Sequence, residues 1–110
     1  MRKALVSALS ASVISLGLIG VTATPALAAN AVACNQDGFM RIYNSDAVHC
    51  FANAGYLDVY ITNVNFVFAG NNRVMVRYND RGGWGSVTLD RWESQGFWDH
   101  SVTVEDITIY

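Results

Sequence analysis

Apolar and polar residues alternate with a period of two along most of the sequence after residue 37, and this pattern constrains the fold more than any other. In residues 56–61, YLDVYI, every second side chain is aliphatic, and residues 73–78, RVMVRY, repeat the alternation. A period of two is that of a β-strand with one buried face. The sequence therefore predicts an all-β protein, and no window of useful length offers a convincing helical stripe.

Turn-forming residues divide the alternating runs into short segments. Asn, Asp and Gly tolerate the backbone angles of tight turns, and they cluster at 44–46, 53–55, 70–72 and 79–83. The segments between these clusters predict about eight antiparallel strands, at 38–43, 47–52, 56–61, 64–69, 73–78, 84–90, 99–104 and 106–110. Short strands with one apolar face each bury those faces by stacking as two sheets. We therefore expect a β-sandwich.

The first 28 residues differ in composition and are expected to be a secretory signal peptide. Arg2 and Lys3 form a positive start, residues 4–21 form an uncharged apolar run, and residues 26–28, Ala-Leu-Ala, place small side chains where a signal peptidase cleaves. The alternative is a membrane anchor, because an apolar run of this length just spans a bilayer. The serines and glycines within the run argue against the anchor. The expectation is a secreted, extracellular protein with one domain, residues 29–110.

The domain is acidic. Residues 29–110 contain five arginines, no lysine and nine acidic side chains, so five minus nine gives a net charge of −4. This balance argues against nucleic acid as a partner and against electrostatic docking on anionic lipid. The negative net charge is weakly compatible with the binding of a cation.

The two cysteines, Cys34 and Cys50, are expected to form one disulfide bond, as cysteines in exported proteins commonly do. Closing a loop of this length stabilises a fold by roughly 3 kcal/mol in the chain-entropy model. Lipidation of Cys34 is the alternative, and it is disfavoured because it would leave Cys50 without a partner.

The predicted hairpin around Tyr78 resembles a motif of a known protein family. Residues 74–89, VMVRYNDRGGWGSVTL, place Gly85 seven residues after Tyr78, and this hairpin resembles the first hairpin of a βγ-crystallin Greek-key motif. The resemblance implies that the glycine has positive φ where the chain folds back and that the aromatic ring covers the corner. RIYN at 41–44 echoes VRYN at 76–79, which puts Tyr43 in the equivalent place and Cys50 where the glycine would stand.

The first half is similar to a subgroup of that family, the Streptomyces killer-toxin-like βγ-crystallins. The residues that carry the similarity are HCFANAG at 49–55 and AGNN at 69–72. The resemblance implies a βγ-crystallin-like sandwich of two Greek-key motifs, about 34–71 and about 72–110, and export. For the type member it implies a toxic action on yeasts and fungi. A relative with the same fold inhibits a metalloproteinase, but this chain has no second disulfide to brace an inhibitory loop.

Many βγ-crystallins bind Ca²⁺ through paired oxygen-rich stretches before the last strand of each motif. In this chain the aligned stretches are residues 61–66, ITNVNF, and 101–106, SVTVED. Neither fits, because Ile61 and Ser101 stand where the leading oxygen donors belong. The sequence predicts no metal site and no cofactor, and leaves open weak Ca²⁺ binding at Asp106 or Asn65.

The tryptophans Trp84, Trp92 and Trp98 lie together in the sequence beside glycine-rich turns. Buried, they would only stabilise the fold. Exposed together, they would form a patch beyond what a monomer normally shows, able to stack on microbial cell-wall polysaccharide or to insert at a membrane interface. We treat them as candidate surface-binding residues on a protein that we expect to be a monomer.

Catalytic side chains are not indicated. His100 lies between Asp99 and Ser101, but neighbouring residues of a strand point to opposite faces, so His100 and His49 are expected to be structural or exposed. Glu93 and Asp99 have the chemistry for sugar hydrolysis, but the domain has little room for a substrate cleft. No spacing fits zinc.

The resulting hypothesis is a secreted, non-enzymatic, killer-toxin-like antimicrobial or antifungal effector that acts by surface binding. The alternatives are a structural or stress-protective extracellular domain without toxicity and, less favoured, a protease inhibitor.

Overall fold

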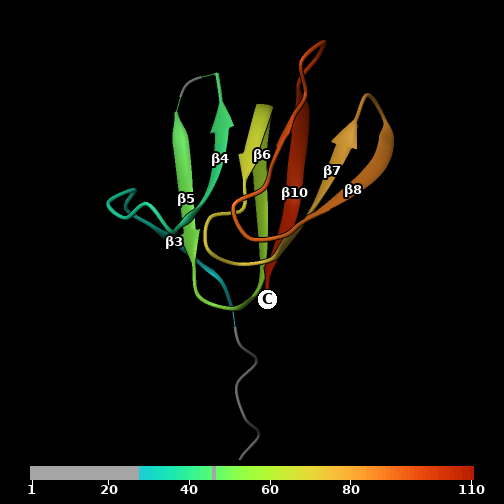
Figure 1. Cartoon of the computed structure of the whole chain (residues 1–110). Coiled ribbons are helices and arrows are strands. Elements are labelled where there is room, and N and C mark those ends of the chain that lie inside the picture. The colour runs from blue at the N-terminus through green and yellow to red at the C-terminus, as the bar shows by residue number, and fades with distance from the viewer. Residues whose placement is uncertain (1–27, 46) are drawn as a thin grey trace, which may run out of the picture.

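A computed structural model of the protein describes residues 28–45 and 47–110 (Figure 1). The predicted signal peptide lies outside these residues except for Ala28. The described part of the chain forms eight strands and no helix, and it therefore includes no helix that could span a membrane. The strands are β3 (Asn30–Val32), β4 (Met40–Asn44), β5 (Val48–Ala52), β6 (Gly55–Phe68), β7 (Val74–Asp80), β8 (Gly83–Leu89), β9 (Ser94–Gly96) and β10 (Val102–Ile109).

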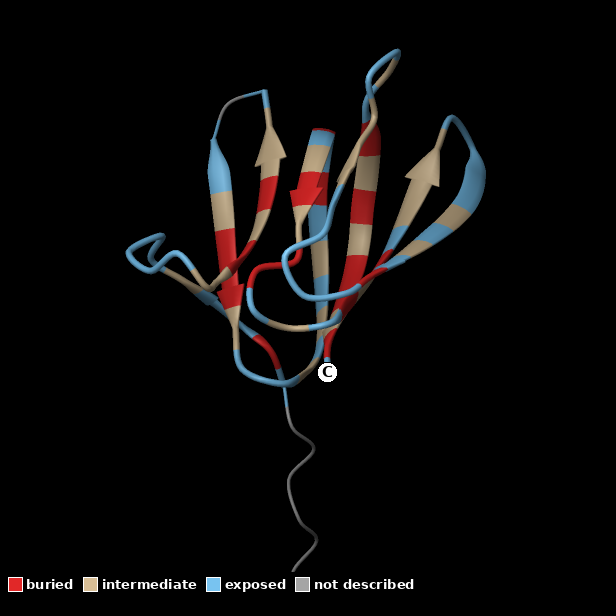
Figure 2. Ribbon diagram, viewed as in Figure 1, coloured by how far each residue is buried: buried red, intermediate tan, exposed pale blue. Residues whose placement is uncertain are grey.

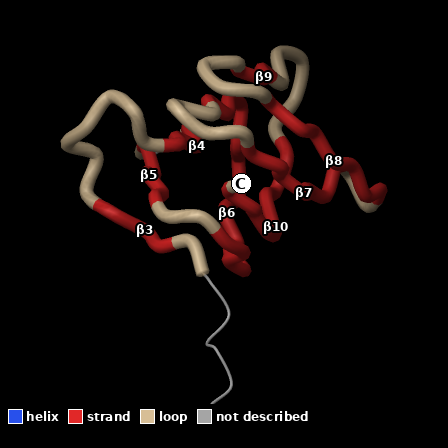
Figure 3. The backbone as a smooth tube through the Cα atoms, turned by 60° about the horizontal axis from the view of Figure 1, so that its bottom comes forward, coloured by secondary structure: helices blue, strands red, loops and turns tan. Residues whose placement is uncertain are grey.

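The strands form two groups that share β6, and all strand pairs are antiparallel. Residues 64–68 of β6 pair with β4 and β9, while residues 55–61 of the same strand, together with Val64, pair with β10. One group is therefore β3–β5–β4–β6–β9, and the other is β6–β10–β7–β8. Figures 1 and 3 show β6 and β10 between the β3–β5–β4 side and the β7–β8 side. The prediction of an all-β fold is confirmed.

Hydrogen bonding joins the two groups into one eight-stranded sheet, because β6 is continuous where the sequence predicted two strands. The predicted strands 56–61 and 64–69 are the two ends of β6. Asn63, at a φ of 58°, lies between them, and the register with β10 shifts there. An irregularity of this kind bends a strand without ending it.

The end of the chain also differs from the prediction. The predicted strands 99–104 and 106–110 form one strand, β10, which begins only at Val102. The register shifts between Val104 and Asp106, so the buried apolar side chains change from the even positions Val102 and Val104 to the odd positions Ile107 and Ile109. Figure 2 shows the resulting bands of buried and half-buried residues along β10. Two short strands, β3 and β9, were not predicted, because three residues are too few to show an alternation.

One apolar core is shared by both groups. Its fully buried large side chains are Met40, Ile42, Val64, Val67, Val74, Val76, Val104 and Ile107. They come from β4 and β6 on one side and from β7 and β10 on the other. The two groups bury their apolar faces against one another, as the alternation of apolar and polar residues predicts.

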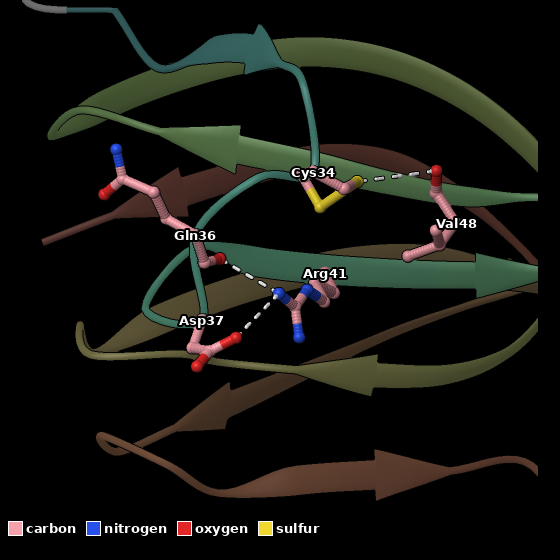
Figure 4. The surroundings of a disulfide bond; sticks show 6 residues. Cys34, Gln36, Asp37, Arg41 and Val48 are labelled. Carbon is pink, nitrogen blue, oxygen red and sulfur yellow. Dashed lines mark hydrogen bonds and ion pairs between the residues drawn. A yellow bond between two sulfur atoms is a disulfide. The ribbon is translucent and has the colours of Figure 1, made fainter.

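The predicted disulfide between Cys34 and Cys50 is present (Figure 4). It ties the segment after β3 to the middle of β5. Arg41, which lies opposite Cys50 in the register of β4 and β5, donates a hydrogen bond of 2.9 Å to the carbonyl oxygen of Gln36 and lies 4.0 Å from Asp37. The segment between β3 and β4 is therefore fixed by a covalent bond and by the Arg41 side chain.

Candidate functional site

The outer face of the β4–β6–β9 region carries a row of aromatic side chains. Phe66 and Phe68 flank the fully buried Val67 on β6, so their rings point away from the core. In the strand register Phe66 lies between Tyr43 on β4 and Gly96 on β9. The rings of Tyr43 and Phe66 meet edge to face, with their centroids 5.5 Å apart.

Trp98 extends this row across β9. Its ring centroid lies 6.0 Å from that of Phe66, and its side chain is 82% exposed. The ring lies directly on the backbone of Gly96: a Cβ atom added there would be 2.2 Å from Trp98 Cε2. Only glycine at position 96 therefore leaves room for the ring in this position.

Trp92 forms the other end of the row. It is 57% exposed, and its ring centroid lies 6.1 Å from that of Phe68. Its backbone has a φ of 67°, which is rare for a bulky side chain. A hydrogen bond of 2.7 Å from the Trp92 amide to the carbonyl oxygen of Gly70 holds this conformation. Backbone strain of this kind is concentrated at functional sites, which draws attention to Trp92.

We call the set Tyr43, Phe66, Phe68, Trp92 and Trp98 the aromatic face. The sequence prediction identified Trp92 and Trp98 but missed the two phenylalanines that connect them. Their signal was present in the alternation of residues 64–68, VNFVF, which places both rings on the side opposite Val67. What the sequence did not show is that β4 and β9 bring Tyr43 and the tryptophans to the same side.

Trp84 lies elsewhere, although the sequence prediction grouped it with the other two tryptophans. It is 65% exposed on β8, opposite Asn79 of β7, and it makes no ring contact with another aromatic side chain in the described part of the chain. With Arg77, Gly85 and Ser86 it lines a shallow, open pocket of about 350 Å³. All three tryptophans are exposed, as the binding hypothesis requires, but they lie on two different surfaces of the molecule.

The predicted corner residues also lie differently in the two halves. Tyr78 lies opposite Gly85, where a Cβ atom would be 2.6 Å from its ring. The φ of Gly85 is not positive, so the ring, and not the backbone angle, requires glycine there. Tyr43 lies opposite Val48, while Cys50 lies opposite Arg41. Cys50 therefore does not take the place of the motif glycine, because the first hairpin is shorter.

His100 lies in a cluster of charged side chains, contrary to the expectation that its neighbour Asp99 would point away. Residues 99–101 precede β10, so strand alternation does not apply to them. His100 Nδ1 lies 2.6 Å from Asp99 Oδ1, and His100 Nε2 lies 2.9 Å from Asp80 Oδ1. The hydrogen bond to Asp80 raises the pKa of His100, and the bonds from His100 lower the pKa of both carboxyl groups.

A second charged pair joins β7 to β10. Asp106 is only 4% exposed, and Arg77 contacts both of its carboxylate oxygens, with Nη2 2.6 Å from Oδ2 and Nε 3.1 Å from Oδ1. These bonds raise the pKa of Arg77. Next to this pair, Tyr56 donates a hydrogen bond of 2.5 Å to Asp58, which raises the pKa of Tyr56.

The two residues for which weak Ca²⁺ binding was left open both have partners within the described part of the chain. Asp106, the acidic residue for which weak binding was left open, is already held by Arg77 on both oxygens. The backbone oxygen of Asn65 accepts a hydrogen bond from the Phe97 amide. Within residues 28–45 and 47–110 no group of three or more His, Cys, Asp or Glu side chains could hold a metal ion.

The remaining candidates for chemistry lie in three different settings. Glu93 accepts a hydrogen bond of 2.8 Å from the Asp90 amide. Asp99, the other half of the carboxylate pair considered for sugar hydrolysis, is bound to His100. His49 is half-buried opposite Ile42, a residue of the core.

Comparison with known proteins gives the family. The sequence profile described as Beta/Gamma crystallin matches residues 41–109. Among solved structures, the antifungal protein from Streptomyces tendae Tu901, determined by NMR, is 33% identical with a TM-score of 0.66, and the match covers 76% of this chain and 100% of that chain. No curated protein gives a significant match. The chain is a member of the βγ-crystallin family.

Proposed function

We propose that this protein is a secreted, non-enzymatic antifungal protein that binds fungal cell-wall polysaccharide through the aromatic face. The likeness to the Streptomyces tendae antifungal protein supports the antifungal role, because it extends over the whole of that protein at 33% identity. The Cys34–Cys50 disulfide supports secretion, since such bonds persist in oxidising surroundings.

The single observation that carries the binding proposal is the arrangement of the aromatic face. Its five side chains are Tyr43, Phe66, Phe68, Trp92 and Trp98, and the tryptophans are more than half exposed. A monomeric protein rarely leaves adjacent large rings in water without a partner. Flat rings in a row match the apolar faces of successive sugar rings, and the indole and phenol groups add polar edges for hydroxyl groups.

The charge of this region favours a neutral polymer over an anionic membrane. Arg41 is the charged side chain nearest in register to Phe68, and it is already engaged by Gln36 and Asp37. The acidic balance of residues 29–110 adds no electrostatic attraction to anionic lipid. Binding therefore depends on ring contact and should change little with salt concentration.

The proposal is tested by sedimentation of the protein with insoluble fungal cell walls and by inhibition of fungal growth. Trp98→Ala and Trp92→Ala are expected to weaken wall binding about tenfold or more each, as loss of an exposed aromatic anchor does at other interfaces. Trp84→Ala is the matched control, because it removes an exposed tryptophan outside the aromatic face, and it should bind like the original protein.

Each other outcome supports a different function. Equal losses in all three variants, or a loss only in Trp84→Ala, would contradict the proposed surface. Binding to lipid vesicles without binding to walls would favour a membrane partner. Absence of wall binding and of growth inhibition would favour the alternative of a structural extracellular domain.

A further inference from the structure

The sheet ends at β8, and this edge of the sheet is unpaired. In the hydrogen-bonded order β3–β5–β4–β6–β10–β7–β8, the last strand pairs with β7 alone within the described part of the chain. Figures 1 and 3 show β8 at the margin of the molecule, on the side opposite β3. An edge strand exposes a row of backbone N–H and C=O groups that can pair with another chain.

Strand β8 lacks the features that normally prevent such pairing. Proteins protect edge strands by making them short, by bulges, or by proline and charged side chains. The outer strands β3 and β9 have only three residues each. In contrast, β8 has seven residues, GWGSVTL, without a proline or a charge, and its register with β7 has no shift. It is therefore a long, regular and uncharged edge.

The turn before β8 determines which backbone groups of the strand face the open edge. Arg81 and Gly82, with φ angles of 54° and 85°, form a two-residue turn of the type that favours hairpins. The residues that flank such a turn, Asp80 and Gly83, form a hydrogen-bonded pair, and every second pair along the hairpin does the same. The even positions of β8 therefore direct their N–H and C=O groups toward the open edge: Trp84, Ser86 and Thr88.

We propose that β8 pairs antiparallel with β8 of a second copy of this chain, with Ser86 opposite Ser86 on the two-fold axis. In this register Trp84 of each copy lies opposite Thr88 of the other, and all the outward-facing residues of both strands are paired. The two strands exchange about six backbone hydrogen bonds in this arrangement. A two-fold axis at any other residue of β8 leaves at least one outward-facing residue without a strand partner.

The side chains of β8 are complementary to themselves in this register. Trp84 and Thr88 are exposed on the outer face of the sheet, and an aromatic ring directly opposite a β-branched side chain stabilises an antiparallel pair. On the inner face Val87, which packs against the core, lies opposite Gly85 of the second copy. Glycine has no side chain, so no two large side chains are forced together there.

The charged residues beside β8 also fit a second copy. Asp80 and Arg81 precede the strand, and Asp90 and Arg91 follow it. Antiparallel pairing brings the start of one strand beside the end of the other, so each end combines equal numbers of acidic and basic side chains. A second copy matches this pattern by symmetry, because a two-fold interface joins the same patch of both subunits.

This dimer replaces the sequence-based expectation of a monomer. It does not depend on the proposed function, because the aromatic face lies on the β4–β6–β9 side of the molecule. Trp84 lies within the proposed contact between copies. Trp84→Ala is therefore compared with the other tryptophan variants on cell walls at protein concentrations at which the chain is monomeric.

The test measures the mass of the disulfide-bonded protein by sedimentation equilibrium as a function of concentration. We expect the mass to rise with concentration toward twice that of the monomer. Amide hydrogen exchange followed by NMR gives the place of contact. The amides of Trp84, Ser86 and Thr88 should be protected only at concentrations at which the dimer forms. Those of Gly85 and Val87, which are bonded to β7, should be protected at every concentration.

Ser86 lies opposite itself only in the proposed register, which allows a charge-exchange test. Ser86→Lys and Ser86→Glu should each weaken self-association about fivefold or more, because like charges then lie directly opposite one another. An equal mixture of the two variants should recover association. Ser86→Pro should abolish association and keep the fold, because the N–H group that proline removes faces solvent in the monomer. Trp98→Ala, on the aromatic face, should associate like the original protein.

Three results would overturn the proposal. The first is a mass that stays monomeric up to millimolar concentration. The second is a dimer that persists in Ser86→Pro, or one that is lost in Trp98→Ala instead, which would place the contact at the aromatic face. The third is a mixture of Ser86→Lys and Ser86→Glu that associates no better than either variant alone. If Ser86→Pro does not fold, this charge exchange still decides.

Discussion

At the scale of single residues, Gly96 determines where Trp98 lies. The ring rests on the backbone of β9 at a distance that excludes any β-carbon at position 96. This contact is local in the sequence, since only Phe97 separates the pair, but it depends on β9 pairing with β6 at Gly96 and Phe66. The sequence predicted that glycines and tryptophans share this region, and it could not show which glycine supports which ring.

We expect Gly96→Ala to displace Trp98 and to weaken wall binding to a degree similar to Trp98→Ala. The physical reason is steric, because the added methyl group would overlap the indole ring. Tryptophan fluorescence in the Trp84→Phe/Trp92→Phe background measures the displacement.

Gly83→Ala is the control for Gly96→Ala. An added Cβ atom at position 83 meets only Asp80 O, at an ordinary 3.5 Å, and the φ of Gly83 is not positive. This variant should leave the emission of Trp98 and wall binding unchanged. An unaltered spectrum in Gly96→Ala would show that Trp98 does not rest on β9.

At the scale of elements, strand alternation predicted most of the sheet, and irregular pairing explains what it missed. Residues 74–80 and 83–89 form the hairpin that the sequence indicated. The fusion of two predicted strands into β6 depends on Asn63, whose left-handed φ allows a bend within a paired strand. The three residues of β9 form a strand only because β6 is beside them, so their own sequence carries no sufficient signal.

The element that depends most on a covalent bond is the segment between β3 and β4. We expect the double variant Cys34→Ser/Cys50→Ser to lose about 3 kcal/mol in the free energy of unfolding, because the unfolded chain regains the freedom of an open loop. Urea denaturation followed by far-UV circular dichroism measures the difference.

Reductant should destabilise the original protein by a similar amount and should have no effect on the double variant. Equal stability of the oxidised protein and the double variant would mean that the contacts of Arg41 with Gln36 and Asp37 alone hold the segment in place.

At the scale of the whole molecule, the two groups of strands present different outer surfaces. The β4–β6–β9 side carries the aromatic face, whereas the β7–β8 side carries Trp84 beside the Arg77–Asp106 pair. The sequence predicted exposed tryptophans, and the topology separates them into two surfaces. That separation depends on the pairing of β9 with β6, a contact between residues far apart in the chain, which is why the sequence grouped the three tryptophans together.

The most direct test of the aromatic face is NMR of the ¹⁵N-labelled protein titrated with a soluble oligosaccharide released from fungal cell walls. The three indole N–H signals, assigned with single Trp→Phe variants, report separately on the two surfaces. We predict saturable shifts of the Trp92 and Trp98 signals and no shift of the Trp84 signal. A shift of the Trp84 signal alone would contradict the account and would place binding in the pocket beside Arg77.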